Sequence, residues 1–284
     1  MPYFYNENAP SSDLACERYR ADLNEDGVKY EKEVCPGGFW ERIAISSVSG
    51  AKSIGRPMGF YDTLNLDPID TLDTDGVRNA SREIADDLLS LVRKMHIIPK
   101  RLLVVGLGNP SLTPDSIGAR CAGGVRATMH IKDMDEAFFD AIDCSEIAVI
   151  QPGVKSKSGI DASDMVLGIC DRIKPNAVIA IDALAALSVD RLGKTVQLSS
   201  TGIIPGSGVG NHRSALDEDS LGVPVISVGV PTVISAERFC RDLNAENTLH
   251  NNSMLVAPKE IDEIARVSGD IISGGINLAF GICT

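Results

Sequence analysis

Residues Leu102 to Gly118 read LLVVGLGNPSLTPDSIG: a short apolar run, a glycine-rich turn and a Thr-Pro-Asp that opens a helix. An apolar run of this length bounded by glycines is typical of a strand that is buried on both faces. The expected helix has a suitable first turn, because Pro114 favours that position and Thr113 or Asp115 can cap it. The stretch therefore predicts a strand, a tight turn and a helix, which is the repeating unit of an α/β sheet.

The same alternation continues along the chain. Further apolar runs occur in EIAVIQPG, AVIAIDAL, VQLSSTG and VPVISVGVPTV, and helical segments are expected at about 115–130, 161–173 and 232–243. A longer helix is expected over about 74–95, where apolar residues recur three, four and seven apart, and a closing helix after Pro258. Apolar strands separated by helices predict the α/β class: three layers, with a mostly parallel central sheet and helices on both faces.

The N-terminal part has a different pattern. FWERIAISSVSG and RPMGFYDTLNL are rich in β-branched and aromatic residues, and we expect them to form an N-terminal β-hairpin joined by residues 50–55. Residues 1 to about 35 are polar and lack a sustained apolar period, so we expect a loosely attached, extended arm there.

The charge balance excludes several classes of partner. The 284 residues include 27 Lys and Arg against 39 Asp and Glu, a net charge of -12, which disfavours binding to nucleic acid or to anionic lipid. No apolar run approaches the ~18 residues of a membrane span, and the first residues lack the pattern of a signal peptide. The sequence therefore predicts a cytoplasmic protein with no direct nucleic-acid partner and no membrane association.

The glycine-rich turn does not fit a nucleotide site. Ser111 stands where a dinucleotide fingerprint has its third glycine, and the next apolar run, EIAVIQPG, ends without an acidic residue for a ribose. A phosphate loop is excluded because the turn has no GK[ST], and a nucleophile elbow because the chain has no GxSxG. The four histidines show no metal-ligand spacing, so we predict neither a cofactor nor a metal.

Two aspartates remain as candidates for chemistry. Asp115 follows the glycine-rich turn, and Asp182 follows the buried run Ala177–Ile181, so both are expected at the carboxyl edge of the sheet. Each has an alternative interpretation as a helix cap. Two carboxylates at one edge can share a proton and activate a water molecule, so a catalytic pair is plausible. The sequence does not indicate which would act as base and which as acid.

The loop STGIIPGSGVGNHR, residues 200–213, is dense in glycine and brings exposed main-chain N–H groups. Such groups can bind a peptide backbone or an oxyanion, although an ordinary surface loop has a similar composition. The candidate substrate-binding residues are Gly106, Gly108 and Asn109 of the first loop, with Gly206, Ser207, Gly208, Gly210 and Asn211 of this one.

Taken together, several motifs resemble the germination protease family of spore-forming bacteria. They are LLVVGLGN with TPDSIG, QPGV with SGI, KPNAVIAIDALAA, STGIIPGSGVGNHR and LGVPVISVGVPTVISA. The resemblance implies an endopeptidase that begins the degradation of small acid-soluble spore proteins, active as a homotetramer in the cytoplasm of the forespore or spore core. It also implies a fold similar to that of hydrogenase-maturation proteases and a non-classical aspartic mechanism, with the catalytic aspartates at Asp115 and Asp182.

The family resemblance extends to SSDLACE near the N-terminus, which is similar to the family's processing site. It implies a zymogen that cuts itself between Asp13 and Leu14, in an exposed arm. Residues 1–13 would then be a propeptide, and residues 14–284 a single α/β peptidase domain. Two alternatives remain: a metal-dependent maturation-type protease that uses both aspartates and a histidine such as His212 as ligands, and a catalytically idle homologue that binds spore proteins.

Overall fold

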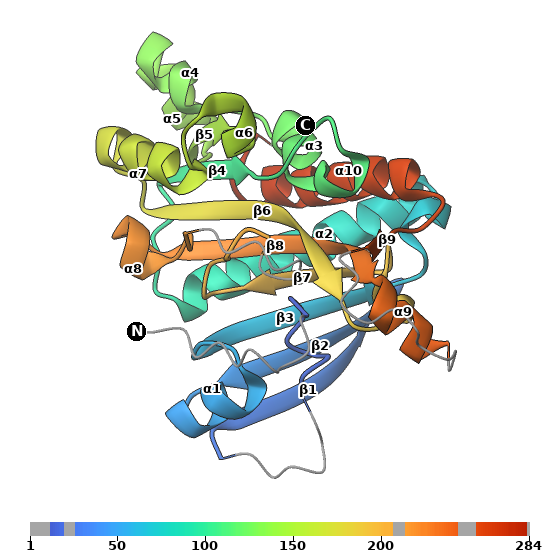
Figure 1. The fold of residues 1–284 in the computed structure, drawn as a ribbon. Helices are drawn as coiled ribbons and strands as arrows, with labels where there is room; N and C mark the ends of the chain where they lie inside the picture. Colours follow the sequence, from blue (N-terminus) through green and yellow to red (C-terminus); the bar gives the residue numbers. More distant parts are fainter. Residues whose placement is uncertain (1–11, 20–25, 207–213, 244–253, 283–284) are drawn as a thin grey trace.

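The computed structural model describes residues 12–19, 26–206, 214–243 and 254–282. Their strands form one mixed sheet in the order β1-β2-β3-β7-β8-β6-β4-β5, with β9 pairing with β8 (Figure 1). The strands are β1 Val28–Cys35, β2 Gly38–Ile45, β3 Gly59–Leu66, β4 Arg101–Gly106, β5 Glu146–Ile150, β6 Ala177–Ala186, β7 Thr195–Ser199, β8 Val225–Ser235 and β9 Leu255–Val256.

Half of the sheet is parallel and carries the apolar runs. β4 pairs in parallel with β5 and with β6, and β6 pairs in parallel with β8. Every residue of β6 from Ala177 to Asp182 is buried, as expected for a strand covered on both faces. This half confirms the α/β class predicted from the sequence.

The other half of the sheet is antiparallel. In the described part of the chain, the predicted parallel pairing is therefore found only among β5, β4, β6 and β8. β7 lies antiparallel between β8 and β3. The run VQLSS was expected among the parallel strands, but residues 187–194 are too few to carry the chain back along the sheet before β7 begins. A parallel crossover needs about a dozen residues or more, so β7 runs the opposite way.

The expected N-terminal hairpin is present as β2 and β3, which pair antiparallel across the short helix α1, Val48–Ile54. The expectation of an arm up to residue 35 was wrong for its last part, because β1 pairs with β2 along its whole length. β1 is an edge strand whose charged side chains are mostly exposed, so it has no apolar period to detect.

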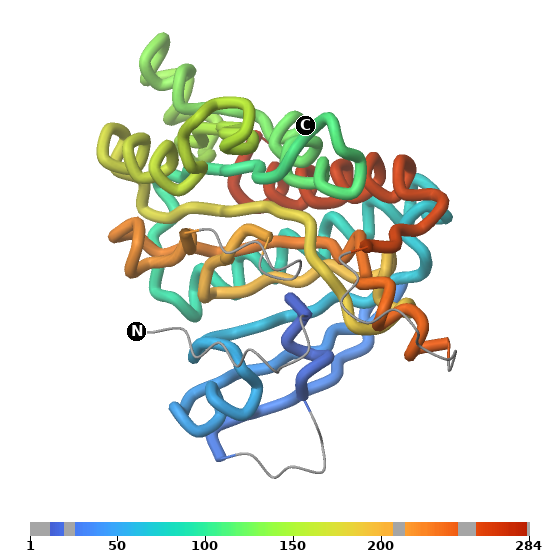
Figure 2. The backbone as a smooth tube through the Cα atoms, viewed as in Figure 1, coloured from blue at the N-terminus to red at the C-terminus, as the bar shows by residue number. Residues whose placement is uncertain are grey.

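Helices cover both faces of the sheet and complete three layers (Figures 1 and 2). α2, Thr74–Lys94, packs with α3, Ile117–Gly124, and α10, Ile261–Phe280, against one face. α7, Ala162–Ile173, and α8, Glu218–Leu221, pack on the other, where alternate residues of β4 and β6 point. The remaining helices are η1 Ile69–Thr71, η2 Thr113–Asp115, α4 Met129–Met134, α5 Glu136–Ile142, α6 Lys155–Ser158, η3 Val189–Arg191 and α9 Ala236–Asp242.

The long helices agree with the predicted ranges. α2 begins after Asp73, whose side chain accepts a hydrogen bond from the Gly76 N–H, and α10 provides the closing helix expected after Pro258. In the part of the chain that the structure describes, no helix combines the length and the apolar character needed to cross a bilayer.

A charged cluster lies between α2 and the sheet, with its two aspartates buried and its two cations partly exposed. Arg42 Nη1 lies 3.2 Å from Asp62 Oδ2 and also bonds Asp87, and Lys94 Nζ lies 3.4 Å from Asp62 Oδ2. Burial, with a further contribution from the Asp62 carboxylate, raises the pKa of Asp87 to about 7. The cluster therefore places a carboxyl group that is readily protonated inside the fold.

Candidate active site

Asp182 lies where β6 loses one of its two neighbours. β4 ends at Gly106, which pairs with Ile181, so Asp182 is the first residue of β6 beyond β4. On its other side Asp182 pairs with Gly229 of β8. The side chain is buried, and its Oδ1 accepts a hydrogen bond of 2.9 Å from the Ala183 N–H.

Asp182 was expected at the end of its own strand, and the alternative interpretation made it the cap of a helix beginning at AlaLeuAlaAla. The structure contradicts both, since β6 runs on beyond Asp182. β6 continues to Ala186, because β8 pairs with it along this length through a β-bulge at Leu184. The apolar run VPVISVGVPTV forms β8, which extends beyond this run to Ser235. The edge at which Asp182 stands is therefore created by the end of β4.

Asp115 is brought to the same edge by the turn that follows β4. It ends η2, which contacts both β6 and β8. Thr232 Oγ1 of β8 donates a 2.7 Å hydrogen bond to the carbonyl of Pro114, and the Asn109 N–H donates to Asp115 Oδ2 at 2.9 Å. The two candidate aspartates thus lie on neighbouring elements at the end of β4.

The first candidate loop is closely packed around Asp115. A Cβ at Gly106 would lie 2.2 Å from the Gly118 carbonyl oxygen, so β4 and α3 approach through this glycine. Gly108 has φ +91°, and a Cβ there would lie 2.1 Å from the Asp115 carbonyl oxygen. Asn109 gives its N–H to Asp115 and accepts at Oδ1 from the Ser111 N–H. Close packing therefore explains why residues 106 and 108 are glycines. The expected role of this loop in substrate binding stays a prediction.

The second candidate loop is described only in its first part. Gly206 is half-buried with φ +73°, whereas Ser207, Gly208, Gly210 and Asn211, with His212, lie outside the described residues. Thr201 to Ile204 line a cavity of about 40 Å³. The same cavity is lined by Leu184 and Gly229, so it lies beside the strand positions that flank Asp182.

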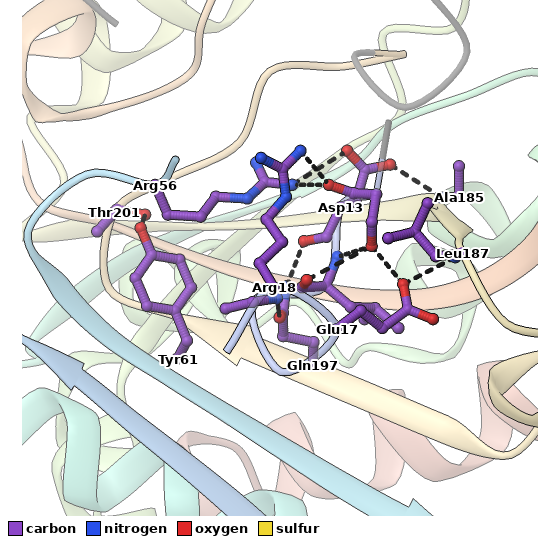
Figure 3. A network of polar contacts seen from close by, with 12 residues as sticks. Asp13, Glu17, Arg18, Arg56, Tyr61, Ala185, Leu187, Gln197 and Thr201 are labelled. Carbon is purple, nitrogen blue, oxygen red and sulfur yellow. Dashed lines mark hydrogen bonds and ion pairs between the residues drawn. The ribbon is translucent and has the colours of Figure 1, made fainter. Parts of the chain in front are cut away.

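The N-terminal segment Ser12–Arg18 is docked at this cavity (Figure 3). Asp13 lines the cavity, and its side chain is only 12% exposed. Leu14 and Ala15 are both fully buried, so the expectation that SSDLACE is exposed was wrong. The reason is local: Leu14 joins the apolar cluster of Ile43, Ile45 and Leu184 on the face of the sheet opposite α2.

Tyr61 closes another side of the cavity as a neutral donor. Burial raises the pKa of its phenol to about 12. The hydroxyl donates to the Pro57 carbonyl at 2.9 Å and accepts from Thr201 Oγ1 at 3.0 Å. The phenol therefore stays protonated near neutral pH and holds the loop that carries Pro57.

Comparisons with known proteins identify the family. A family model described as "Germination protease" matches residues 11–245. The germination protease of Clostridium perfringens is 33% identical over 94% of each chain, and that of Caldanaerobacter subterraneus is 34% identical over 89% of this chain and 88% of that one. The germination protease of Oceanobacillus iheyensis is 41% identical over 75% of this chain and 60% of its own.

This chain belongs to the germination protease family. The predicted resemblance is thereby confirmed, and the family is one of proteases. Among solved structures, the [NiFe] hydrogenase maturation protease HycI from Thermococcus kodakarensis matches 61% of this chain and 90% of its own, with a TM-score of 0.34 and 16% identity.

Within this member of the germination protease family, the sequence did not point to Arg56 or Gln197, both of which contact the docked segment. For Gln197 the sequence holds a weak signal, because a polar residue interrupts the apolar run VQLSS. The structure shows that this glutamine is buried, which is uncommon for the residue type. For Arg56 the sequence holds no such signal. The described residues contain no group of three or more His, Cys, Asp or Glu side chains arranged to hold a metal ion.

Proposed function

We propose that this chain is the endopeptidase that begins the degradation of small acid-soluble spore proteins during spore germination, with Asp115 and Asp182 as its catalytic pair. Membership of the germination protease family supports a protease of germination, and the meeting of η2 with β6 and β8 at the end of β4 supports the choice of aspartates. The second observation carries the proposal, since it brings two carboxylates from distant parts of the chain to one edge of the sheet.

In the proposed mechanism the two carboxyl groups share one proton and hold a water molecule. One carboxylate takes a proton from the water as it attacks the peptide carbonyl, and the other carboxyl group polarises that carbonyl and later protonates the leaving nitrogen. The surroundings suit unequal roles, because Asp182 is buried and Asp115 is half-buried.

The same proposal includes a zymogen that cuts itself between Asp13 and Leu14, and an active homotetramer in the cytoplasm of the forespore or spore core. No cofactor takes part. The burial of Leu14 and Ala15 adds one requirement, since a bond must be accessible and extended to be cut. The segment therefore has to leave its buried position before self-cleavage, which would begin the mature chain at Leu14.

The proposal is tested by incubating the purified full chain with a small acid-soluble spore protein and identifying the fragments by mass spectrometry. Asp115→Asn and Asp182→Asn keep the shape of the side chain and should each lower the cleavage rate by roughly 10²- to 10⁴-fold. Asp171→Asn, at an exposed aspartate of α7, is the matched control. Near-normal cleavage by both site variants would exclude the pair, and activity lost to a chelator and restored by a metal would assign metal chemistry instead.

A further inference from the structure

β8 contains one residue that has no counterpart in its neighbour β6. The residues of the two strands pair one to one up to Leu184 and Pro231. The next pair joins Ala185 to Val233, so Thr232 is left over as the extra residue of a β-bulge. Proline in a sheet is typical of bulges, and bulges beside functional sites serve to redirect a side chain. The direction and contacts of the Thr232 side chain therefore matter.

The bulge reverses the faces to which β8 presents its side chains. Ile226, Val228 and Val230 lie in the apolar cluster that packs against α2 and α10. Ile234, an even number of residues further on, lies in the cluster on the opposite face. Because side chains alternate strictly along a regular strand, one extra residue is needed between Val230 and Ile234. Thr232 supplies it, and the register is shifted within a few residues of the candidate site.

The hydroxyl group of Thr232 is used to hold η2. Thr232 is fully buried, and its Oγ1 donates a hydrogen bond of 2.7 Å to the Pro114 carbonyl. The N–H of the same peptide unit belongs to Asp115 and donates to the Leu112 carbonyl at 2.8 Å. The peptide unit next to the Asp115 side chain is therefore fixed at both ends, by β8 at one end and by its own turn at the other.

β8 also borders the other candidate aspartate. Gly229, three residues before Thr232, pairs with Asp182 of β6, and Figure 1 shows β8 running beside β6. Asp115 belongs to η2 and is not part of the strand ladder. One strand thus contacts Asp182 through main-chain pairing and the support of Asp115 through a side chain. β8 is the common element that relates the two carboxylates in space.

We propose that Thr232 is a positioning residue of the protease, whose hydroxyl holds η2 on β8 so that the Asp115 carboxylate keeps its place relative to Asp182. This inference rests on the proposed function and deepens it, because it gives the bulge of β8 a role in the reaction. The hydroxyl acts through the Pro114 carbonyl and does not need to touch the substrate. It should therefore affect the rate of the chemical step and leave the affinity for the peptide unchanged.

The hydroxyl cannot be replaced by shape alone. Valine at this position would place a methyl group against the Pro114 carbonyl, and a carbonyl that loses its donor has to turn towards another one. Such a turn moves the peptide unit that carries Asp115. Two carboxyl groups that share a proton and a water molecule depend on their separation, and a displacement of about 1 Å can lower a rate by about 100-fold.

Steady-state kinetics with a small acid-soluble spore protein as substrate test the inference. Thr232→Val should lower kcat at least about tenfold and change KM by less than about twofold. Thr232→Ser keeps the hydroxyl and should retain most of the wild-type kcat. The matched control is Thr195→Val in β7, because Thr195 is also buried and its Oγ1 donates to a carbonyl, that of Arg191, at 3.1 Å. It should leave kcat and KM unchanged.

Hydrogen exchange measures the support of η2 without requiring cleavage. Main-chain N–H groups in residues 107–118 should exchange at least about tenfold faster in Thr232→Val than in the wild-type chain, and at the wild-type rate in Thr195→Val. This measurement also shows whether each variant is folded, because exchange in the other strands should not change.

The outcomes separate the inference from the proposed function. Wild-type kcat in Thr232→Val, or a Thr232→Ser variant as slow as Thr232→Val, would overturn the role of the hydroxyl while the proposed function stands. If the wild-type chain cuts no spore protein, the proposed function fails. Unchanged exchange of residues 107–118 in Thr232→Val would then show that Thr232 does not hold η2 either.

Discussion

The N–H of Asn109 donates to Asp115 twice, to Oδ2 and to the carbonyl oxygen, at 2.9 Å each. This shared hydrogen bond fixes both the main chain and the side chain of Asp115. Gly108, next to Asn109, permits it because a Cβ there would meet Asp115. The turn after β4 therefore positions a carboxylate by close main-chain packing.

Gly108→Ala should disrupt the proposed aspartate pair. The new Cβ would lie 2.1 Å from the Asp115 carbonyl oxygen and 2.9 Å from Oδ1, so Asp115 must move. A displacement of about 1 Å at a reacting group can lower the rate by about 100-fold, and we expect a loss of that size in cleavage of a spore protein. Gly153→Ala is the control, because Gly153 also has positive φ, +71°, but a Cβ there meets no atom within 4 Å. Equal activity of the two variants would show that cleavage does not depend on the position of Asp115.

Asp87 should make the stability of the protein fall as the pH rises. Its pKa is raised from 3.8 to about 7, chiefly by burial, so between these pH values the folded chain keeps a proton that the unfolded chain has released. Stability from this group is fully present at low pH and is lost as the pH rises through the raised pKa. The urea midpoint of the wild-type chain should therefore decrease between pH 5 and pH 7.5 more than that of Asp87→Asn. Asp86→Asn, at the exposed neighbour on α2, should keep the wild-type slope.

The parallel half of the sheet could be predicted because burial on both faces leaves uninterrupted apolar runs, as in β4 and β6. β1 could not, since an edge strand is protected by charges such as Lys32 and Glu33 that conceal its period. The end of β6 was misjudged because AlaLeuAlaAla favours a helix by intrinsic propensity. Pairing with β8 overrides that preference.

The position of the two candidate aspartates at one edge of the sheet could be predicted because each comes after an apolar run, a local signal, whereas their catalytic role stays a prediction. The contacts of Asp13 could not, because Arg56, Ala185 and Gln197 are far apart in the sequence and meet only through the register of the sheet. Asp87 left a signal that is visible in retrospect. It lies three residues after Ile84 and one before Leu88, on the apolar face of α2, where a charged residue needs a partner.

Gly118→Ala should destabilise the contact between α3 and the sheet. A Cβ at this position would lie 2.3 Å from the Ile181 carbonyl oxygen and 2.4 Å from that of Leu107, and neither main-chain atom can move freely. Overpacking of this kind costs about 1–3 kcal/mol in the free energy of unfolding, which urea denaturation can measure. Gly168→Ala, in the interior of α7 with no atom within 4 Å of the new Cβ, should instead stabilise by about 0.5–1 kcal/mol. A Gly118→Ala variant as stable as the wild type would show that α3 can shift away from β6.

Gln197→Ala should loosen the docked N-terminal segment. The variant removes the hydrogen bonds to the Asp13 carbonyl and from the Ala15 N–H, each worth about 0.5–1.5 kcal/mol. The two bonds together are worth about 1–3 kcal/mol, and about 1.4 kcal/mol corresponds to a factor of ten in an equilibrium, so opening of the segment should become roughly 5- to 150-fold more frequent. Limited trypsin digestion followed by mass spectrometry should then show faster cleavage after Arg18. Gln151→Ala, at an exposed glutamine, should digest like the wild type, and an unchanged rate in Gln197→Ala would mean that the apolar burial of Leu14 holds the segment by itself.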